Sequence, residues 1–190
     1  MSVSKDAPEF TFDQAMARWN ITSRQWLEDN KSTLDNAAVA AFVFDDKDRV
    51  LLVQRASHDS MPNRWEAPGG AADDVDESML HSAARELFEE SGLRAKRFVR
   101  FVQEIPGSDI GTVYSNRTGA RHFCRFAFEV GVEDCSCVKL DPSEHQDFLW
   151  AGEEEVKVQR VGEREIPITT PAVHAHLLEA FKARKASSKQ

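Results

Sequence analysis

Apolar and polar positions along the chain form runs that predict strands and helices in a mixed order. Runs of small and β-branched residues at 37–44 and 50–56 flank the polar turn DDKDR, a pattern typical of a β-hairpin. Two more strands are predicted at 96–105 and 120–132, joined by a long loop that contains glycine, proline and asparagine. A further strand-like stretch follows at 147–156.

Three segments carry the features of helices. Residues 10–30 alternate polar positions with Phe, Met, Trp and Ile, which predicts one or two short amphipathic helices before the main domain. Residues 76–91 predict a helix that ends at Gly92, because glycine adopts the left-handed conformation without strain. Towards the carboxyl end, Thr170 is suited to cap a helix and Pro171 to begin it. The order of strand, turn, helix and strand favours a layered α/β domain.

Length and composition fit one folded domain with short flanking segments. The chain has 190 residues, of which 41% are hydrophobic and 29% charged, close to the averages of globular proteins. We expect a helical flank at 1–34, the main domain at 35–185 and a disordered tail at 186–190. A formal net charge of −8 argues against a broad grip on nucleic acid, which needs a basic surface.

Sequence features also limit the cellular compartment and the classes of partner that we expect. No run approaches the roughly 20 apolar residues of a membrane helix, and the first ten residues lack the order of a signal peptide. Cys124, Cys135 and Cys137 have no zinc-finger spacing, and reduced thiols fit the cytosol. We therefore expect a cytoplasmic protein without a membrane or nucleic-acid partner, and with a homodimer as a possible state.

The helix predicted at 76–91 gathers three glutamates on one side. Glu86, Glu89 and Glu90 stand at positions i, i+3 and i+4, so their carboxylates lie within reach of one another. Each like-charge pair costs about a few tenths of a kcal/mol on an exposed helix, and more where water is excluded. If the glutamates form an ordinary solvated acidic face, their mutual repulsion remains. If they bind a divalent cation, its positive charge removes the repulsion.

The residues around these glutamates resemble the signature of the Nudix hydrolases, G-x5-E-x7-R-E-U-x-E-E-x-G-U, where U is aliphatic. From Glu77 to Leu93 every specified position matches. Six residues, instead of five, separate Gly70 from Glu77, which requires a glycine loop that is longer by one residue, and a loop accommodates an insertion cheaply. The resemblance implies an α/β/α sandwich with a mixed β-sheet, covering about 37–155.

The resemblance also implies the roles of the motif residues. The cofactor would be Mg2+ or Mn2+, with Glu86 and Glu90 as direct ligands and Glu89 as a ligand or a group that orients water. Glu77 is expected as a supporting carboxylate. Arg85 would orient the acidic face, since it stands four residues before Glu89.

The glycine turn before the helix is expected to bind substrate. Gly69 and Gly70 allow the backbone to turn sharply and to approach a ligand closely. Asp74 or Asp76 is expected to cap the helix, the former in a capping box with Glu77.

Residues outside the motif are candidates for proton transfer and phosphate binding. In the family the base is often a glutamate on a loop, and Glu144 is the first candidate by position, with Glu104 the second. His145 could assist a proton transfer. Arg55 and Arg64 lie on segments expected to converge on the glycine turn, where a guanidinium could bind a phosphate, although a surface salt bridge would explain either residue equally well.

The motif defines the reaction more closely than the substrate. The resemblance implies a metal-dependent hydrolase of a diphosphate linkage, with a nucleoside diphosphate derivative as the first expectation. A prenyl or terpenoid diphosphate hydrolase and a non-catalytic nucleotide-binding module stay open. A nucleoside would need an aromatic residue such as Phe12, Trp19 or Tyr114 at the rim of the pocket, whereas a prenyl chain would need a deep apolar slot.

Overall fold

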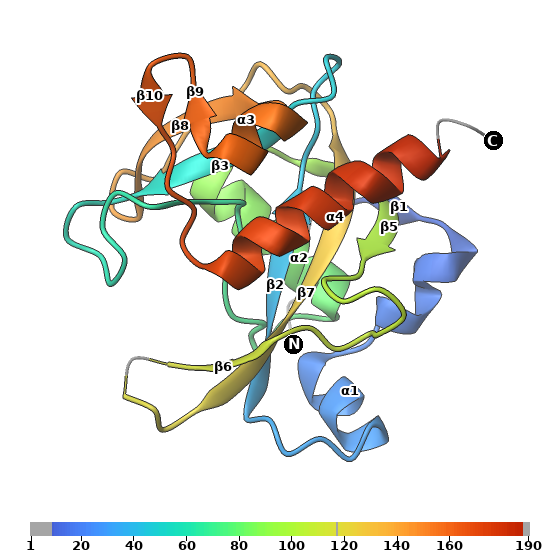
Figure 1. Ribbon diagram of the computed structural model, residues 1–190. Helices are drawn as coiled ribbons and strands as arrows, with labels where there is room; N and C mark the ends of the chain where they lie inside the picture. Colours follow the sequence, from blue (N-terminus) through green and yellow to red (C-terminus); the bar gives the residue numbers. More distant parts are fainter. Residues whose placement is uncertain (1–8, 117, 188–190) are drawn as a thin grey trace.

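The computed structural model describes residues 9–116 and 118–187, and the statements below refer to these residues (Figure 1). The strands are β1 (Thr11–Phe12), β2 (Asn36–Phe42), β3 (Val50–Arg55), β4 (Trp65–Glu66), β5 (Ala95–Val102), β6 (Val113–Ser115), β7 (His122–Val132), β8 (His145–Ala151), β9 (Arg160–Val161) and β10 (Arg164–Glu165). The helices are the 3-10 helix η1 (Gln14–Trp19), α1 (Ser23–Asp29), α2 (Met79–Ser91), α3 (Glu153–Val158) and α4 (Pro171–Ser187).

A mixed five-stranded sheet forms the centre of the fold. Its order is β1-β5-β7-β2, with β6 beside β7. Strand β2 runs parallel to β7, whereas β5 and β6 are antiparallel to it. A second sheet, of order β4-β3-β8, has three antiparallel strands. The expectation of an α/β fold with a mixed sheet is confirmed.

Helices cover both faces of the central sheet, because β2 is apolar on both sides. Val39 packs with the buried face of α2, whereas Phe42 packs with α4 on the opposite face. In Figure 1, α4 crosses in front of β2 and β7 while α2 lies behind them. The result is the predicted α/β/α arrangement, in which β2 lies in the sheet between the two helical layers.

The N-terminal segment is part of this core. Helices η1 and α1 confirm the expected short helices, and β1 pairs with β5 in parallel. Trp19 and Trp26 are buried, and both rings contact Phe126 of β7. Aromatic burial of this size ties the segment to the sheet. Residues 1–8 of the predicted flank lie outside the described residues.

The predicted hairpin of 37–44 and 50–56 forms only beside its turn. Phe44 and Val50 form an antiparallel bridge, and the N–H of Leu51 donates to the carbonyl of Val43 at 2.9 Å, but β2 and β3 belong to different sheets. The free edge of β2 binds the glycine segment instead, since the N–H of Val39 donates to the carbonyl of Gly70 at 2.8 Å. These backbone groups are therefore unavailable to β3, and the glycine turn is fastened to the central sheet.

The prediction of a strand through 147–156 is wrong in its second half. Strand β8 ends at Ala151, and helix α3 begins after Gly152. Three glutamates occupy the first turn of α3, where negative charge interacts favourably with the helix dipole. The side chain of Glu155 also accepts a hydrogen bond of 2.7 Å from the N–H of Gly152.

Helix α4 begins as predicted. The backbone N–H of Val173 donates to Oγ1 of Thr170 at 3.1 Å, which makes Thr170 the N-cap. The helix extends to Ser187, so the first two residues of the tail predicted at 186–190 are helical, and 188–190 lie outside the described residues. Among the described helices, none has the length and apolar character needed to span a bilayer. The domain boundaries, the homodimer and the cytoplasmic location stay predictions.

Candidate active site

Helix α2 begins three residues later than expected, after a different cap. Oγ of Ser78 accepts a hydrogen bond of 3.3 Å from the N–H of His81, so the expectation of Asp74 or Asp76 as the cap is wrong. A serine hydroxyl is an equally good N-cap acceptor, and here it directly precedes the first helical turn. The predicted end is confirmed, since Gly92 is left-handed with φ of 70°.

Asp76 pairs with the arginine of the motif. Nη2 of Arg85 donates to Oδ2 of Asp76 at 3.0 Å, and Nε lies 3.2 Å from both carboxylate oxygens. Burial raises the pKa of Asp76, but hydrogen bonds and the charge of Arg85 outweigh it and leave this pKa below its ordinary value. Glu77, expected as the supporting carboxylate, is 64% exposed and faces His81 at 3.5 Å.

This pairing bears on where the extra residue of the motif lies. Five residues separate Gly70 from Asp76, which is the spacing that the signature requires between its glycine and its first acidic residue. Asp76 therefore offers a second alignment of the motif, in which the extra residue follows Asp76 instead of lying in the glycine loop. The sequence signal was present as G-x5-D, but the better match of Glu77 to the helical part of the motif concealed it.

Arg85 also contacts two of the three helical glutamates. Its Nη1 donates to Glu86 at 2.8 Å and to Glu89 at 2.9 Å, and its Nη2 donates to the carbonyl of Ala71 at 3.1 Å. These are the contacts that the expected orienting role requires. Glu89 is 52% exposed, whereas the side chain of Glu86 is only 12% exposed.

The glycine turn lies directly against the acidic helix. Glu90 is buried, and its carboxylate accepts a hydrogen bond of 2.8 Å from the N–H of Gly69. A Cβ on Gly69 would lie 2.2 Å from the carbonyl oxygen of Val39, and one on Gly70 would lie 2.7 Å from the carboxylate of Glu86. Gly69 therefore needs glycine, because its neighbour is backbone, whereas a side chain at position 70 would displace the carboxylate of Glu86. Burial and neighbouring carboxylates raise the pKa of Glu86, and raise that of Glu90 further above its ordinary value.

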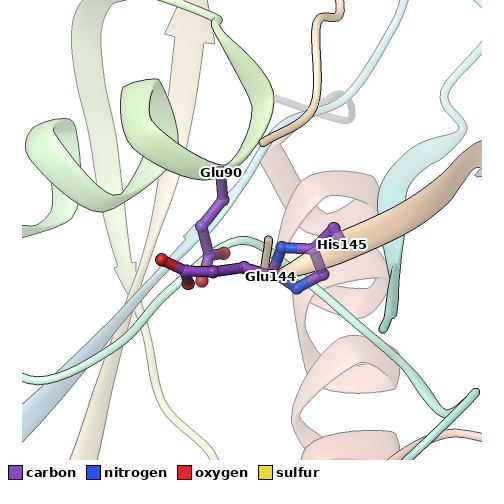
Figure 2. A group of neighbouring side chains, drawn as sticks. All are labelled: Glu90, Glu144 and His145. Atoms are coloured by element: carbon purple, nitrogen blue, oxygen red, sulfur yellow. The ribbon is translucent and has the colours of Figure 1, made fainter. Parts of the chain in front are cut away.

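A distant loop brings two more groups to Glu90. Ligand atoms of Glu90, Glu144 and His145 lie within 4.8 Å of one another, and Figure 2 shows the two carboxylates side by side. Glu144 is exposed, whereas His145 begins β8 and is 2% exposed. Of the three predicted ligands, only Glu90 belongs to this cluster among the described residues. Carboxylates gathered in this way suit Mg2+ or Mn2+, which prefer oxygen donors.

The two arginines predicted to bind phosphate have other contacts. The guanidinium of Arg55 binds the carboxylate of Glu66 through Nη1 and that of Asp59 through Nη2, so both terminal nitrogens already have anionic partners. Arg64 is exposed, and its Nη1 lies 3.5 Å from the carbonyl of Ile168. Arg55 lines the cavity described next, whereas Arg64 does not.

A cavity of about 740 Å³ extends from the glycine turn. Gly69 and Gly70 line one part of it, and Tyr114, Phe123 and Arg125 line another. The rings of Tyr114 and Phe123 are stacked, with centroids 5.8 Å apart and an angle of 22° between their planes. Sequence reasoning missed Phe123 and Arg125, although both alternate along β7 with buried residues and so face away from the α2 layer.

The other candidates separate into core and cavity residues. Trp19 is 1% exposed and Phe12 packs against the core, and neither lines the cavity at the glycine turn, whereas Tyr114 does. Glu104, the second candidate base, lines the cavity but accepts a hydrogen bond of 2.9 Å from the N–H of Thr112. Glu104 therefore stabilises the loop that contains Thr112, whereas Glu144 is the loop glutamate beside Glu90.

The chain belongs to the Nudix family, because a NUDIX domain model matches residues 34–170, more than half of its length. No curated protein matches the chain in sequence.

Solved structures with a similar fold come from several organisms. The MutT protein of Methanosarcina mazei Go1 is 24% identical, with 78% of this chain and 94% of that one covered and a TM-score of 0.54. A Nudix hydrolase from Nitrosomonas europaea is 22% identical, with 78% and 89% covered and a TM-score of 0.58. A C. elegans Ap4A hydrolase in a binary complex is 19% identical, with 80% and 98% covered and a TM-score of 0.54. These similarities establish the fold.

Proposed function

We propose that the protein is a metal-dependent hydrolase that cleaves the diphosphate linkage of a nucleoside diphosphate derivative. The observation that carries this proposal is the continuity of the cavity between the glycine turn and the stacked pair Tyr114 and Phe123. A diphosphate bound at the glycine turn would lie beside Glu86 and Glu90, and its nucleoside would extend towards Tyr114. Aromatic side chains bind nucleobases by stacking, at about 1–3 kcal/mol per base.

The metal would be Mg2+ or Mn2+, held by Glu86, Glu90 and Glu144. Its positive charge would offset the negative charge of the diphosphate and favour attack by water. Glu144 was first expected as the base, but it lies in the ligand cluster with Glu90, so we assign it to metal binding. Glu89 is half exposed and bonded to Arg85, and we assign it to orienting the attacking water.

Charge in the cavity supports an anionic, polar substrate. Arg125 contributes a positive charge to a lining that also contains Glu66 and Glu104. A guanidinium suits phosphate recognition because its planar group donates two parallel hydrogen bonds. A prenyl chain would instead bury these charged groups against hydrocarbon, which is costly. The lining therefore favours the nucleoside derivative over the prenyl or terpenoid alternative.

A substrate panel tests the proposal. Nucleoside triphosphates, dinucleoside polyphosphates, nucleotide sugars and prenyl diphosphates would be incubated with the protein and Mg2+ or Mn2+, in water enriched in 18O. We expect release of a nucleoside phosphate only when metal is present, with one labelled oxygen on a phosphoryl product.

Two results would overturn parts of the proposal. Turnover of prenyl diphosphates alone would contradict the substrate class. Metal-dependent binding of nucleotides without turnover of any compound would contradict the proposed reaction. The substitution Glu86→Gln gives the matched control, since it should keep the fold and abolish the metal-dependent release.

A further inference from the structure

His145 is a buried side chain without a hydrogen-bond partner among the described residues. The residue is 2% exposed, and neither Nδ1 nor Nε2 makes a hydrogen bond. An unsatisfied buried polar group costs about 1–3 kcal/mol. Such a cost is expected at a site whose ligand completes the missing bonds.

The ring lies at the candidate metal site. A ring nitrogen of His145 and carboxylate oxygens of Glu90 and Glu144 lie within 4.8 Å of one another (Figure 2). Two atoms on opposite sides of an octahedral ion with bonds of about 2.1 Å lie about 4 Å apart. Small side-chain movements would therefore bring all three groups into one coordination sphere. The backbone of His145 is held in place, because His145 pairs with Arg55 of β3 at the start of β8. Only the side chains would have to move.

We infer that His145 is a nitrogen ligand of the metal ion, together with Glu90 and Glu144. This assignment rests on the proposed function, and it adds a ligand of a different chemical kind to a set of carboxylates. Imidazole favours transition-metal ions, whereas carboxylates alone suit Mg2+. The site should therefore bind Co2+ and Mn2+ more tightly, relative to Mg2+, than a site made only of carboxylates.

Glu66 completes the arrangement as a positioning residue. Its Oε1 lies 3.9 Å from Nε2 of His145, and its carboxylate is buried and bound by Arg55. Histidines that bind metals commonly donate their other ring N–H to a carboxylate, which fixes the tautomer and the ring orientation. Arg55, predicted to bind phosphate, would then act through Glu66 by holding this carboxylate beside the ring.

Pulsed electron paramagnetic resonance of bound Mn2+ tests the inference directly. The metal-free protein would be loaded with Mn2+, and its spectrum compared with that of protein carrying 15N-labelled histidine. We expect a modulation from a coordinated 14N nucleus that changes when histidine is labelled. Bound Mn2+ without this modulation would overturn the assignment of His145 and leave the proposed hydrolase intact. Failure to bind Mn2+ at all would overturn the proposed metal site, and this inference with it.

Two substitutions separate His145 from His58, an imidazole on another loop that lies against the segment before β8. Nε2 of His58 lies 3.0 Å from the carbonyl of Ser143, two residues before His145, so His58→Gln is a matched control. His145→Gln should abolish the nitrogen modulation and weaken Co2+ binding by at least about tenfold, with a smaller loss for Mg2+. His58→Gln should change neither.

An unchanged ratio of Co2+ to Mg2+ affinity in folded His145→Gln would contradict the inference. Loss of the modulation in His58→Gln but not in His145→Gln would reassign the ligand. If His145→Gln does not fold, the labelling experiment on the unaltered chain still decides the question.

Discussion

The backbone N–H of Gly69 donates a hydrogen bond of 2.8 Å to the buried carboxylate of Glu90. This bond joins the glycine turn to the last turn of α2, 21 residues further along the chain. Because the turn is also bonded to β2, it keeps the acidic helix, the central sheet and the cavity in one arrangement.

Gly69→Ala should destabilise the protein by about 3 kcal/mol or more, because the new Cβ would lie 2.2 Å from the carbonyl oxygen of Val39. Urea unfolding followed by circular dichroism measures the change. Gly131→Ala in β7 is the control, since its Cβ would approach only the carbonyl of Arg97 at 3.7 Å. Similar losses in the two variants would show that the close packing of Gly69 is not the cause.

Glu86→Gln should raise the melting temperature of the metal-free protein and remove its response to Mg2+. Burial, together with the charges of Glu89 and Glu144, raises the pKa of Glu86, so its ionised form is disfavoured in the fold. The neutral amide avoids this repulsion but loses a ligand charge. Differential scanning fluorimetry with EDTA or Mg2+ measures both effects, and the wild type should be stabilised by Mg2+. A wild-type melting temperature that does not respond to metal would contradict the site.

Asp76→Asn should destabilise the protein by about 1–2 kcal/mol and lower its activity, because Arg85 loses a charged partner that is 10% exposed. Glu77→Gln should change the stability by less than about 0.5 kcal/mol, because its side chain is 64% exposed. Urea unfolding of both variants distinguishes the two alignments of the motif. The reverse ranking would restore Glu77 as the supporting carboxylate.

Asp45→Asn should reduce stability at neutral pH and have less effect in acid. Burial raises the pKa of Asp45, but hydrogen bonds and the charge of Arg49 outweigh burial, so this pKa is below its ordinary value in the fold. The stabilisation is therefore fully present above the unfolded pKa of about 3.9, and it disappears as pH falls through the lower folded value.

Urea unfolding of the wild type and Asp45→Asn across this range measures the effect. The difference in the free energy of unfolding should be about 1–3 kcal/mol at pH 7 and should shrink below about pH 4. The exposed neighbour Asp46→Asn is the control and should show little difference. A difference that grows as pH falls would contradict the assignment.

Tyr114→Ala should raise KM for a nucleoside substrate by about 5- to 100-fold, with a smaller change in kcat, because the stacking surface is lost. Tyr114→Phe keeps the ring beside Phe123 and should preserve KM. Steady-state kinetics on the best substrate of the panel measures both. Equal KM values in the alanine variant and the wild type would contradict the assignment of Tyr114 to the substrate site.

Local features of this protein were predictable from its sequence. The spacing of Glu86, Glu89 and Glu90 puts them on one side of α2, and Gly92 ends that helix, because both follow from the geometry of a few consecutive residues. The cap at Thr170 is local in the same sense. The family signature then indicated the fold and the kind of reaction.

Tertiary structure alone decided which distant groups meet at the site. Strand β2 pairs with the glycine segment instead of β3, and Glu144 and His145 reach Glu90 from a loop 54 residues away. Asp76, rather than Glu77, binds Arg85 because the folded turn places its carboxylate 3.0 Å from Nη2 of Arg85. Sequence periodicity reports contacts within one element, whereas these contacts depend on how several elements pack around a shared core.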